Sequence, residues 1–502
     1  ETMATKDEAE LLKELDGVHL GINNNENPDG PIESAMFSIP NDTNTSGNSD
    51  EQDEDLKLST PEPIDVNVDT PLELVEKPVE PKRHALLSDP DFDPTGALFK
   101  NQEKHLFIFS IAGKPIYSRH GDEDKLASLF GVMQALVSFC EDEGDVLKSV
   151  RAGKHLIVFE VKGPLVFVVA ANTGESENQL ATQIKYVHNQ VIFHLTMSQL
   201  TRIFESQINY DLRRMLTGTE KFIDSLIDFM DIDPCFFLGA VRCLPLQSSV
   251  REKIGKVLLD NRIKDLVFGI LIADNQLIAL LRPKRYSLHP ADLHLIFNLV
   301  SNNSVFSAGE CYMPMCLPKF NNTGFLHAHV SYVDEACTAC LLLITNNRDA
   351  FVELRNCRTN IVKNLASNGC LNEISRAANN SGYRLDNIEV PDLRHFLYKA
   401  KSIAMFTSPI LEAPYNLPGE ELRLFRRYLF VHHRIHSEVR PLKIYWHAGE
   451  RETLLGWVTY GFELFATFGP LVTKPAAINA VLRLIRWMKR EEDGLFIYSS
   501  LV

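Results

Sequence analysis

The stretch Leu106-Phe-Ile-Phe-Ser-Ile-Ala-Gly-Lys-Pro-Ile-Tyr-Ser-Arg119 is the strongest structural signal in this chain. Its first part, Leu106–Ala112, is apolar at nearly every position, which is typical of a central strand covered on both faces. Gly113 and Pro115 then predict a turn, because glycine tolerates a positive φ and proline donates no hydrogen bond to a sheet. The stretch therefore predicts a β-hairpin that opens a helix-covered sheet.

The same order of elements recurs three times along the chain. After the first hairpin we expect a helix at Glu123–Phe139, three strands within Val146–Ala171 and another helix from Glu177. The second copy begins at Asp265 and the third near Leu393. A recurring supersecondary unit indicates several small α/β modules rather than one large catalytic fold.

The helix after the first hairpin carries an apolar stripe at helical spacing, which predicts that this face packs on the sheet. The stripe consists of Leu126, Phe130, Met133, Val137 and Cys140. We therefore interpret Phe130 and Met133 as core residues.

The repeats also predict the domain organisation. The predicted parts are a head at 1–100, modules at 104–208, 263–378 and 383–502, and a helical connector at 209–262. Within the connector we expect a helical stretch at Tyr210–Met230 and a strand-like segment at Cys235–Cys243.

The acidity of the chain is concentrated in its head. Residues 1–100 hold 24 acidic and 7 basic residues, a net charge of −17, whereas the remaining 402 residues hold 42 and 44. With ten prolines and three aromatic residues, the head buries too little apolar surface to offset its ordering entropy, so we expect disorder. Ser49 precedes an acidic run; a solvated linker is the simpler interpretation, and phosphorylation of Ser49 is the alternative.

Composition excludes several classes of protein. The modules are nearly neutral, so they offer no field for a nucleic-acid duplex, and no nucleic-acid partner is expected. The start of the sequence shows no apolar signal segment, and no apolar run approaches the roughly 18 residues of a membrane span. Nine scattered cysteines indicate reduced thiols. We therefore expect a cytoplasmic protein.

Four cysteines come closest to a metal signature. Cys311 and Cys316 are followed by the motif Cys337-Thr-Ala-Cys340, and a structural zinc ion requires four converging ligands. However, Cys340 leads into the apolar run Leu341–Ile344, and an offset of three along a strand directs two side chains to opposite faces. The pattern favours buried structural thiols over zinc, so neither a metal nor a cofactor is predicted.

A predicted helix in the third repeat carries histidines and arginines. His432 and His436 lie one helical turn apart and could hold a metal ion, but no acidic partner follows at helical spacing. A solvated basic face is the simpler interpretation, and binding of acidic lipid headgroups is the alternative. The candidate lipid-binding residues are Arg426, Arg427, Arg434 and Arg440.

The sequence lacks the common catalytic signatures. It contains neither of the phosphate-binding glycine loops, G-x-G-x-x-G and G-x4-G-K-[ST], nor the nucleophile motif G-x-S-x-G. We therefore predict a protein without covalent catalysis. Each α/β module leaves an exposed edge strand, and extension of a sheet across a partner is a natural use for such an edge.

Several blocks of the sequence resemble the monensin-sensitivity family of vacuolar fusion proteins. The hairpin at 106–119 and the segment Asp122–Phe130 carry the resemblance, with similar blocks at Arg151–Phe159, Leu317–Val330 and Arg440–His447. The blocks occur in order across about residues 100–502. The resemblance implies three longin domains after the acidic head, each with a five-stranded, largely antiparallel sheet flanked by helices.

The family resemblance also implies partners. It implies a heterodimer with a second tri-longin protein, of the calcium-caffeine-zinc-sensitivity family, that acts as guanine-nucleotide exchange factor for the late-endosomal and vacuolar Rab GTPase. An early-endosomal Rab and phosphoinositide membranes would recruit the pair, and a third subunit with a β-propeller would join in metazoa. Exchange of this kind works by binding the opened GTPase better than the closed one, without covalent chemistry.

The resemblance places both the partner and the GTPase on the first module. The candidate contacts are Lys114, Pro115, Tyr117, Arg119, Asp124, Lys125 and Ser128. A purely structural role is an equal alternative for each of them. For the acidic head we hypothesise autoinhibition, in which it covers the basic patch around Arg426–Arg440. The rival functions are a trafficking scaffold without exchange activity and a metal-dependent enzyme built on the four cysteines.

Overall fold

The computed structural model describes residues 96–303, 306, 309–380 and 382–498. Most of the predicted disordered head, including Ser49, lies outside the described residues. The end of that segment does not: Ala97–Lys100 form the short helix α3. Phe99 of α3 is buried, with its ring centroid 4.3 Å from that of His105. The predicted head therefore extended too far along the chain, because this aromatic side chain anchors its last residues to the first domain.

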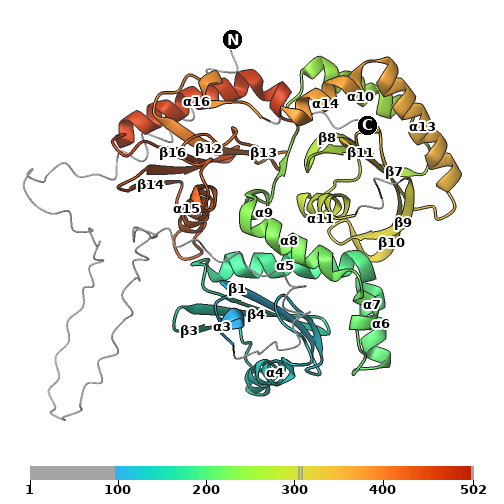
Figure 1. The fold of residues 1–502 in the computed structure, drawn as a ribbon, viewed down its shortest axis with the longest axis vertical. Coiled ribbons are helices and arrows are strands. Elements are labelled where there is room, and N and C mark those ends of the chain that lie inside the picture. The colour runs from blue at the N-terminus through green and yellow to red at the C-terminus, as the bar shows by residue number, and fades with distance from the viewer. Residues whose placement is uncertain (1–95, 304–305, 307–308, 381, 499–502) are drawn as a thin grey trace, which may run out of the picture. The chain divides into compact units, whose positions relative to one another are not determined.

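The first domain is a five-stranded antiparallel sheet with a helix on each face (Figure 1). All seven residues of β1 are buried, as predicted for a central strand. Phe130 and Met133 of α4 lie in one core with Phe107 and Phe109 of β1, and α5 covers the opposite face. The strand order is β2-β1-β5-β4-β3. The elements are β1 (Lys104–Ser110), β2 (Pro115–Ser118), α4 (Ala127–Asp142), β3 (Ser149–Ala152), β4 (His155–Lys162), β5 (Leu165–Ala171) and α5 (Glu177–Leu195).

The second domain repeats this strand order as β8-β7-β11-β10-β9. Three helices, α10, α13 and α14, share one core with the sheet, and α11 covers its other face (Figure 1). The elements are β7 (Leu266–Ala273), β8 (Gln276–Leu281), α11 (Pro290–Ser301), β9 (Cys311–Leu317), β10 (Asn321–Tyr332), β11 (Ala339–Thr345), α13 (Phe351–Ser367) and α14 (Cys370–Asn379).

The third domain has the order β13-β12-β16-β15-β14, with α15 and α16 on opposite faces (Figure 1). The elements are the 3₁₀ helix η1 (Leu385–Asn387), β12 (Leu393–Ala400), β13 (Met405–Thr407), α15 (Glu420–Ile435), β14 (Ile444–Ala448), β15 (Thr453–Val458), β16 (Phe462–Phe468) and α16 (Lys474–Leu495). Three sheets of the same topology confirm the predicted three-domain α/β fold.

The connector contributes a strand as well as helices. β6 (Val241–Arg242) pairs in parallel with β13, and the next residue, Cys243, forms a bridge to Leu277 of β8. One short segment thus closes an edge of the third sheet and contacts an edge of the second. The connecting helices are α6 (Met197–Ser206), α7 (Arg213–Leu216), α8 (Glu220–Ile232), α9 (Cys235–Leu238) and α10 (Ser248–Asp260).

Within the connector, two predicted elements are wrong in detail. The strand-like segment Cys235–Cys243 begins as the helical turn α9, which ends because Gly239 adopts a left-handed conformation. The single helix predicted at Tyr210–Met230 is divided into α7 and α8 by Gly218, whose φ is +83°.

The helix predicted at Glu123–Phe139 also begins later, at Ala127. Asp122 Oδ1 accepts hydrogen bonds from the backbone N–H groups of Asp124 and Lys125, which holds this segment in a turn. Phe130, Met133 and Val137 of the predicted stripe are buried. Cys140 is only half-buried.

Helix α5 contacts the helices of the other two domains. It begins at a capping box formed by Ser176 and Gln179. Gln179 Nε2 donates to the carbonyl oxygen of Leu429 on α15 at 2.9 Å, and the hydroxyl of Tyr186 lies 3.1 Å from His294 Nδ1 on α11. These contacts make α5 the common support of the three domains.

A close approach between β15 and α15 leads to a stability prediction. A Cβ atom at Gly456 would overlap Ile435 and Val431 of α15, so Gly456→Val should lower the free energy of unfolding by about 1–3 kcal/mol. At Gly131 of α4, a Cβ atom meets nothing within 4 Å. Gly131→Ala should instead stabilise the protein by about 0.5–1 kcal/mol. Chemical unfolding of both variants measures these two changes in the free energy of unfolding, which should have opposite signs. Equal changes in the two variants would contradict the packing described here for Gly456 and Gly131.

Candidate interaction site on the first domain

Helix α8 of the connector covers the predicted contact residues at the end of the hairpin. The hydroxyl of Tyr117, which is 1% exposed, donates to Asp224 Oδ1 at 2.5 Å. Arg119 Nη2 lies 2.9 Å from Asp228 Oδ1. Tyr117 is therefore not available to a partner, and the prediction for it is wrong because α8 packs on β2.

The turn of the hairpin lies beside the same connector. Lys114 Nζ lies 3.4 Å from the carbonyl oxygen of Asn209, and Pro115 is half-buried at the start of β2. Asp124, which is exposed, accepts a hydrogen bond from Arg213 Nη1 at 2.8 Å. Most of the predicted contact residues thus hold the connector against the first sheet.

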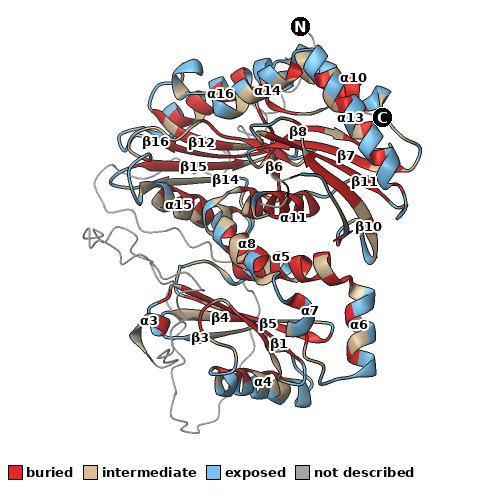
Figure 2. Ribbon diagram, turned by 45° about the vertical axis from the view of Figure 1, so that its right-hand side comes forward, coloured by how far each residue is buried: buried red, intermediate tan, exposed pale blue. Residues whose placement is uncertain are grey.

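Helix α4 presents a second apolar stripe, this time to solvent. Val132, Leu136 and Phe139 are 59%, 45% and 67% exposed. The predicted contacts Lys125 and Ser128 are exposed near the beginning of the same helix. Figure 2 shows exposed residues along the outer face of α4. A helix that is apolar on both faces is typical of a buried or partner-covered element. The sequence carries this signal, since the three positions follow i, i+4 and i+7 spacing.

The first sheet also offers a free edge next to this helix. β3 is the last strand of the order β2-β1-β5-β4-β3, and among the described residues it pairs only with β4. Val150 of β3 packs against the core that contains the buried residues of α4, so the edge strand and the helix border the same core. Exposed backbone groups at such an edge can extend the sheet into a partner.

A buried ion cluster fixes α8 to the first domain. Lys104 Nζ lies 2.7 Å from Glu175 Oε2 and 2.5 Å from Asp231 Oδ1, and both Lys104 and Glu175 are 6% exposed. Burial alone would lower the pKa of Lys104, but the charges of Asp231 and Glu175 raise it above its usual value. Lys104 also donates to Gln183 Oε1 at 3.1 Å. The cluster holds the connector over the hairpin.

The four predicted lipid-binding arginines differ in accessibility. Arg427 is 9% exposed and its Nε lies 3.6 Å from Glu452 Oε1, so it cannot reach a headgroup and the prediction for it is wrong. Arg426 Nη2 lies 2.6 Å from Glu103 Oε2 of the first domain. The two exposed residues are Arg434 and Arg440.

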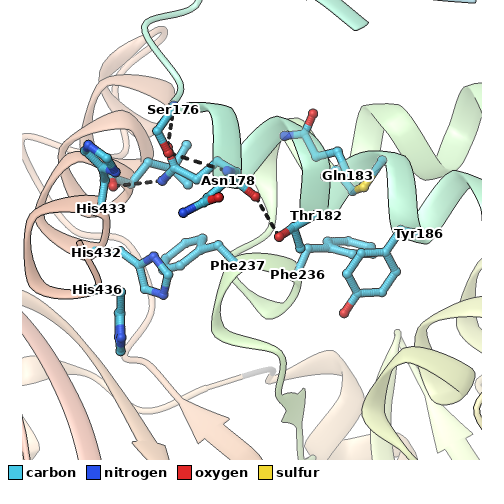
Figure 3. Close-up of a pocket in the computed structure, with 13 residues that line it drawn as sticks. Ser176, Asn178, Thr182, Gln183, Tyr186, Phe236, Phe237, His432, His433 and His436 are labelled. Atoms are coloured by element: carbon cyan, nitrogen blue, oxygen red, sulfur yellow. Dashed lines mark hydrogen bonds between the residues drawn. The ribbon is translucent and has the colours of Figure 1, made fainter. Parts of the chain in front are cut away.

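The structure supplies the acidic partner that the sequence did not place beside the histidines. Glu463 of β16 faces His432 and His436 of α15, and one ligand atom from each lies within 4.8 Å of the others. Burial lowers the pKa of His432 to about 3. Burial opposes ionisation of Glu463, but the hydrogen bond with His436 and the charge of Lys399 lower its pKa to about 2. Both histidines border the cavity shown in Figure 3.

The four cysteines of the metal signature form no metal-binding group within the part of the chain that the structure describes. Cys311 and Cys316 lie on β9 and Cys340 lies on β11, whereas Cys337 occupies the preceding loop with a φ of +54°. Burial raises the pKa of Cys316 and of Cys340 to about 12 each. These two are buried structural thiols, as the sequence favoured.

Comparison with known proteins identifies the three domains. The first, second and third Longin domains of FUZ, MON1 and HPS1 match residues 104–226, 264–363 and 392–492. The chain is 45% identical over 405 residues to vacuolar fusion protein MON1 homolog A of Gallus gallus, covering 81% of this chain and 74% of that protein. The chain belongs to the MON1 family of tri-longin proteins.

Other MON1 proteins are similar to this chain in sequence identity and in the share of the chain that aligns. MON1 homolog A of Homo sapiens is 44% identical over 84% of this chain and 65% of its own length. MON1 homolog B of Mus musculus is 41% identical over 82% of this chain and 78% of its own. Among solved structures, a bacteriophytochrome aligns over 72% of this chain and 82% of its own with 9% identity and a TM-score of 0.14, too low to bear on the fold.

Residues 227–263 lie between the first and the second matched longin domain and belong to neither match. This segment contains α9 and β6. The segment that joins the sheets is thus outside the matched domains. None of the helices described here has the length and hydropathy needed to cross a bilayer.

Proposed function

We propose that this chain is one subunit of a heterodimeric guanine-nucleotide exchange factor that activates the late-endosomal and vacuolar Rab GTPase. Its relatives are named for vacuolar fusion, which supports a trafficking role. The observation that carries the proposal is the exposed apolar face of α4, in a domain whose sheet ends in the edge strand β3. A second tri-longin protein, of the calcium-caffeine-zinc-sensitivity family, would cover this surface.

The proposed activity needs no covalent chemistry. If the paired longin domains bind the opened, nucleotide-free GTPase better than the nucleotide-bound form, nucleotide affinity falls by the same factor. A preference of about 10⁴-fold, or roughly 5.5 kcal/mol, would reverse a 99:1 equilibrium between the closed and open forms. We place the GTPase near the exposed start of α4, at Lys125 and Ser128, because α8 already covers Tyr117.

Recruitment to membranes would use the other domains. The proposed complex acts during the maturation of early into late endosomes and in vacuole or lysosome fusion, as a cytoplasmic protein held peripherally on those membranes. An early-endosomal Rab and phosphoinositides would recruit it, and a β-propeller-containing subunit would join in metazoa. Arg434 and Arg440 are the exposed arginines of the third domain that would meet acidic headgroups.

Removing residues 1–95 should raise exchange on acidic vesicles, because their net negative charge would otherwise compete with lipid for basic residues such as Arg434 and Arg440. The gain should shrink at 0.5 M salt, where charges are screened beyond about 4 Å. Exchange without vesicles is the control and should not change. Equal activity of the truncated and full chains on vesicles would rule out autoinhibition through these charges.

The proposal is tested by the release of a fluorescent guanine nucleotide from a panel of Rab GTPases. The pair should accelerate release from the late-endosomal Rab and leave the others at their intrinsic rates. Binding of that Rab without faster release would overturn exchange activity and support the alternative, a trafficking scaffold.

A further inference from the structure

Three side chains from two elements of the third domain converge beside a cavity. His432 and His436 lie on one face of α15, one turn apart, and Glu463 lies on β16 beneath them. His436 Nε2 is 3.6 Å from Glu463 Oε2, and the two imidazole ring centroids are 4.4 Å apart. Figure 3 shows both histidines on α15, next to Phe237 of the connector.

These distances are close to those of a metal site. Zinc binds imidazole nitrogen and carboxylate oxygen at about 2.0–2.2 Å, so neighbouring ligands of a tetrahedral ion lie about 3.3–3.5 Å apart. The pair of His436 and Glu463 nearly meets this separation at 3.6 Å. All three ligand atoms lie within 4.8 Å of one another, so they would have to approach by at most about 1.5 Å to reach this spacing.

The surroundings orient the three groups. The ring of His432 packs against Phe237 and Phe465, with centroids 5.1 and 5.9 Å apart. Lys399 Nζ lies 3.4 Å from Glu463 Oε1, and Lys401 also contacts this oxygen. The other oxygen, Oε2, is the one directed to His436. The two ammonium groups orient the carboxylate, as residues that contact a metal ligand from outside do in metal sites. Their positive charge also weakens the binding of a cation.

We propose that His432, His436 and Glu463 form a binding site for one divalent transition-metal ion of the zinc class. Two imidazoles and one carboxylate suit zinc and its neighbours in the first row better than magnesium or calcium, which prefer oxygen ligands. A water molecule from the adjoining cavity, about 100 Å³ in volume, would complete a tetrahedron. The bound ion would fasten α15 to β16 beside α5, where the first and third domains meet.

The test is a calorimetric titration of the metal-free full chain with Zn²⁺, repeated with Co²⁺ as an absorption probe of tetrahedral geometry. We expect one ion per chain, with a Kd weakened to the micromolar range by Lys399 and Lys401. Loss of an outer partner alone reduces metal affinity by about 10–100-fold, so His436→Ala should reduce it by at least about 100-fold. The half-exposed position of His436 allows this change without unfolding.

Two further variants separate this site from adventitious binding. His433 is the neighbouring histidine, lines the same cavity and lies outside the cluster, so His433→Ala should bind zinc like the unaltered chain. Glu463→Gln should weaken binding at least about 10-fold, because a histidine pair alone lacks the third ligand. Absence of saturable binding, or equal affinities of the His436→Ala and His433→Ala variants, would overturn the proposal. So would unchanged affinity of Glu463→Gln.

Discussion

Replacing Phe139 by aspartate should separate this chain from the proposed longin partner without unfolding it. Phe139 is 67% exposed and forms an apolar stripe with Val132 and Leu136, so it is available to be buried by a partner. Loss of a large apolar contact near the centre of an interface costs at least about 2 kcal/mol, or roughly a 30-fold rise in Kd. The charge of the new carboxylate adds to this cost when it is buried. Calorimetry with the partner measures the change in Kd.

A matched variant in the second domain controls for the effect of adding a charge at the protein surface. Val352 is 65% exposed on α13, so Val352→Asp introduces the same charge at a similarly exposed apolar position. Both variants should unfold within about 0.5 kcal/mol of the unaltered chain, as exposed substitutions usually do. If Phe139→Asp binds the partner as tightly as Val352→Asp, α4 is not the partner surface.

The second large effect concerns the ion cluster that fixes the connector. Lys104→Met would leave the carboxylate of Glu175 without its buried counter-charge and, within the described part of the chain, Asp231 paired only with Arg119. Removing one partner of a buried ion pair costs about 3–5 kcal/mol, because the remaining charge is uncompensated. The first domain should therefore unfold at lower denaturant, and α8 should exchange its amide hydrogens faster. Chemical unfolding measures the first effect, and hydrogen exchange resolved by segment measures the second.

Lys185 provides the control for this substitution. It is exposed on α5, so Lys185→Met removes the same charge without opening a buried cluster. Its stability should change by no more than about 0.5 kcal/mol. Similar destabilisation by the two substitutions would show that the cluster around Lys104 contributes little to holding α8.

Patterns that are local in sequence predicted the fold well. The buried run of β1 and the inward stripe Phe130, Met133 and Val137 both follow from residue spacing alone. The threefold repeat predicted three similar modules, and the structure shows that their sheets share one strand order. By contrast, the connector strand β6 was not predicted as a partner of β13, because two residues of extended chain carry no periodic signal.

The site was predicted less well, since the failures involve contacts between distant segments. The sequence predicts Tyr117 as a partner contact, but Asp224 of α8 covers it. The sequence predicts Arg427 as a lipid-binding residue, but it packs beside Glu452. Residue spacing on one element cannot show which distant element covers it.

Two features missed from the sequence differ in how they could have been found. The outward stripe that includes Phe139 was visible as a second run of apolar residues at helical spacing on the same helix. The sequence could not place Glu463 beside His436, because the two residues lie on different elements. Glu463 belongs to β16, a strand that pairs with β15, whereas His436 ends helix α15. Only the fold brings these two side chains together.

The most direct measurement is the rate of fluorescent nucleotide release from the late-endosomal Rab GTPase. It is recorded with this chain alone, with the second tri-longin protein alone, and with both together. We expect acceleration only when both are present, and a loss of that acceleration with Phe139→Asp at concentrations near the Kd of the unaltered pair. A pair that binds the GTPase and leaves the release rate unchanged would contradict exchange activity.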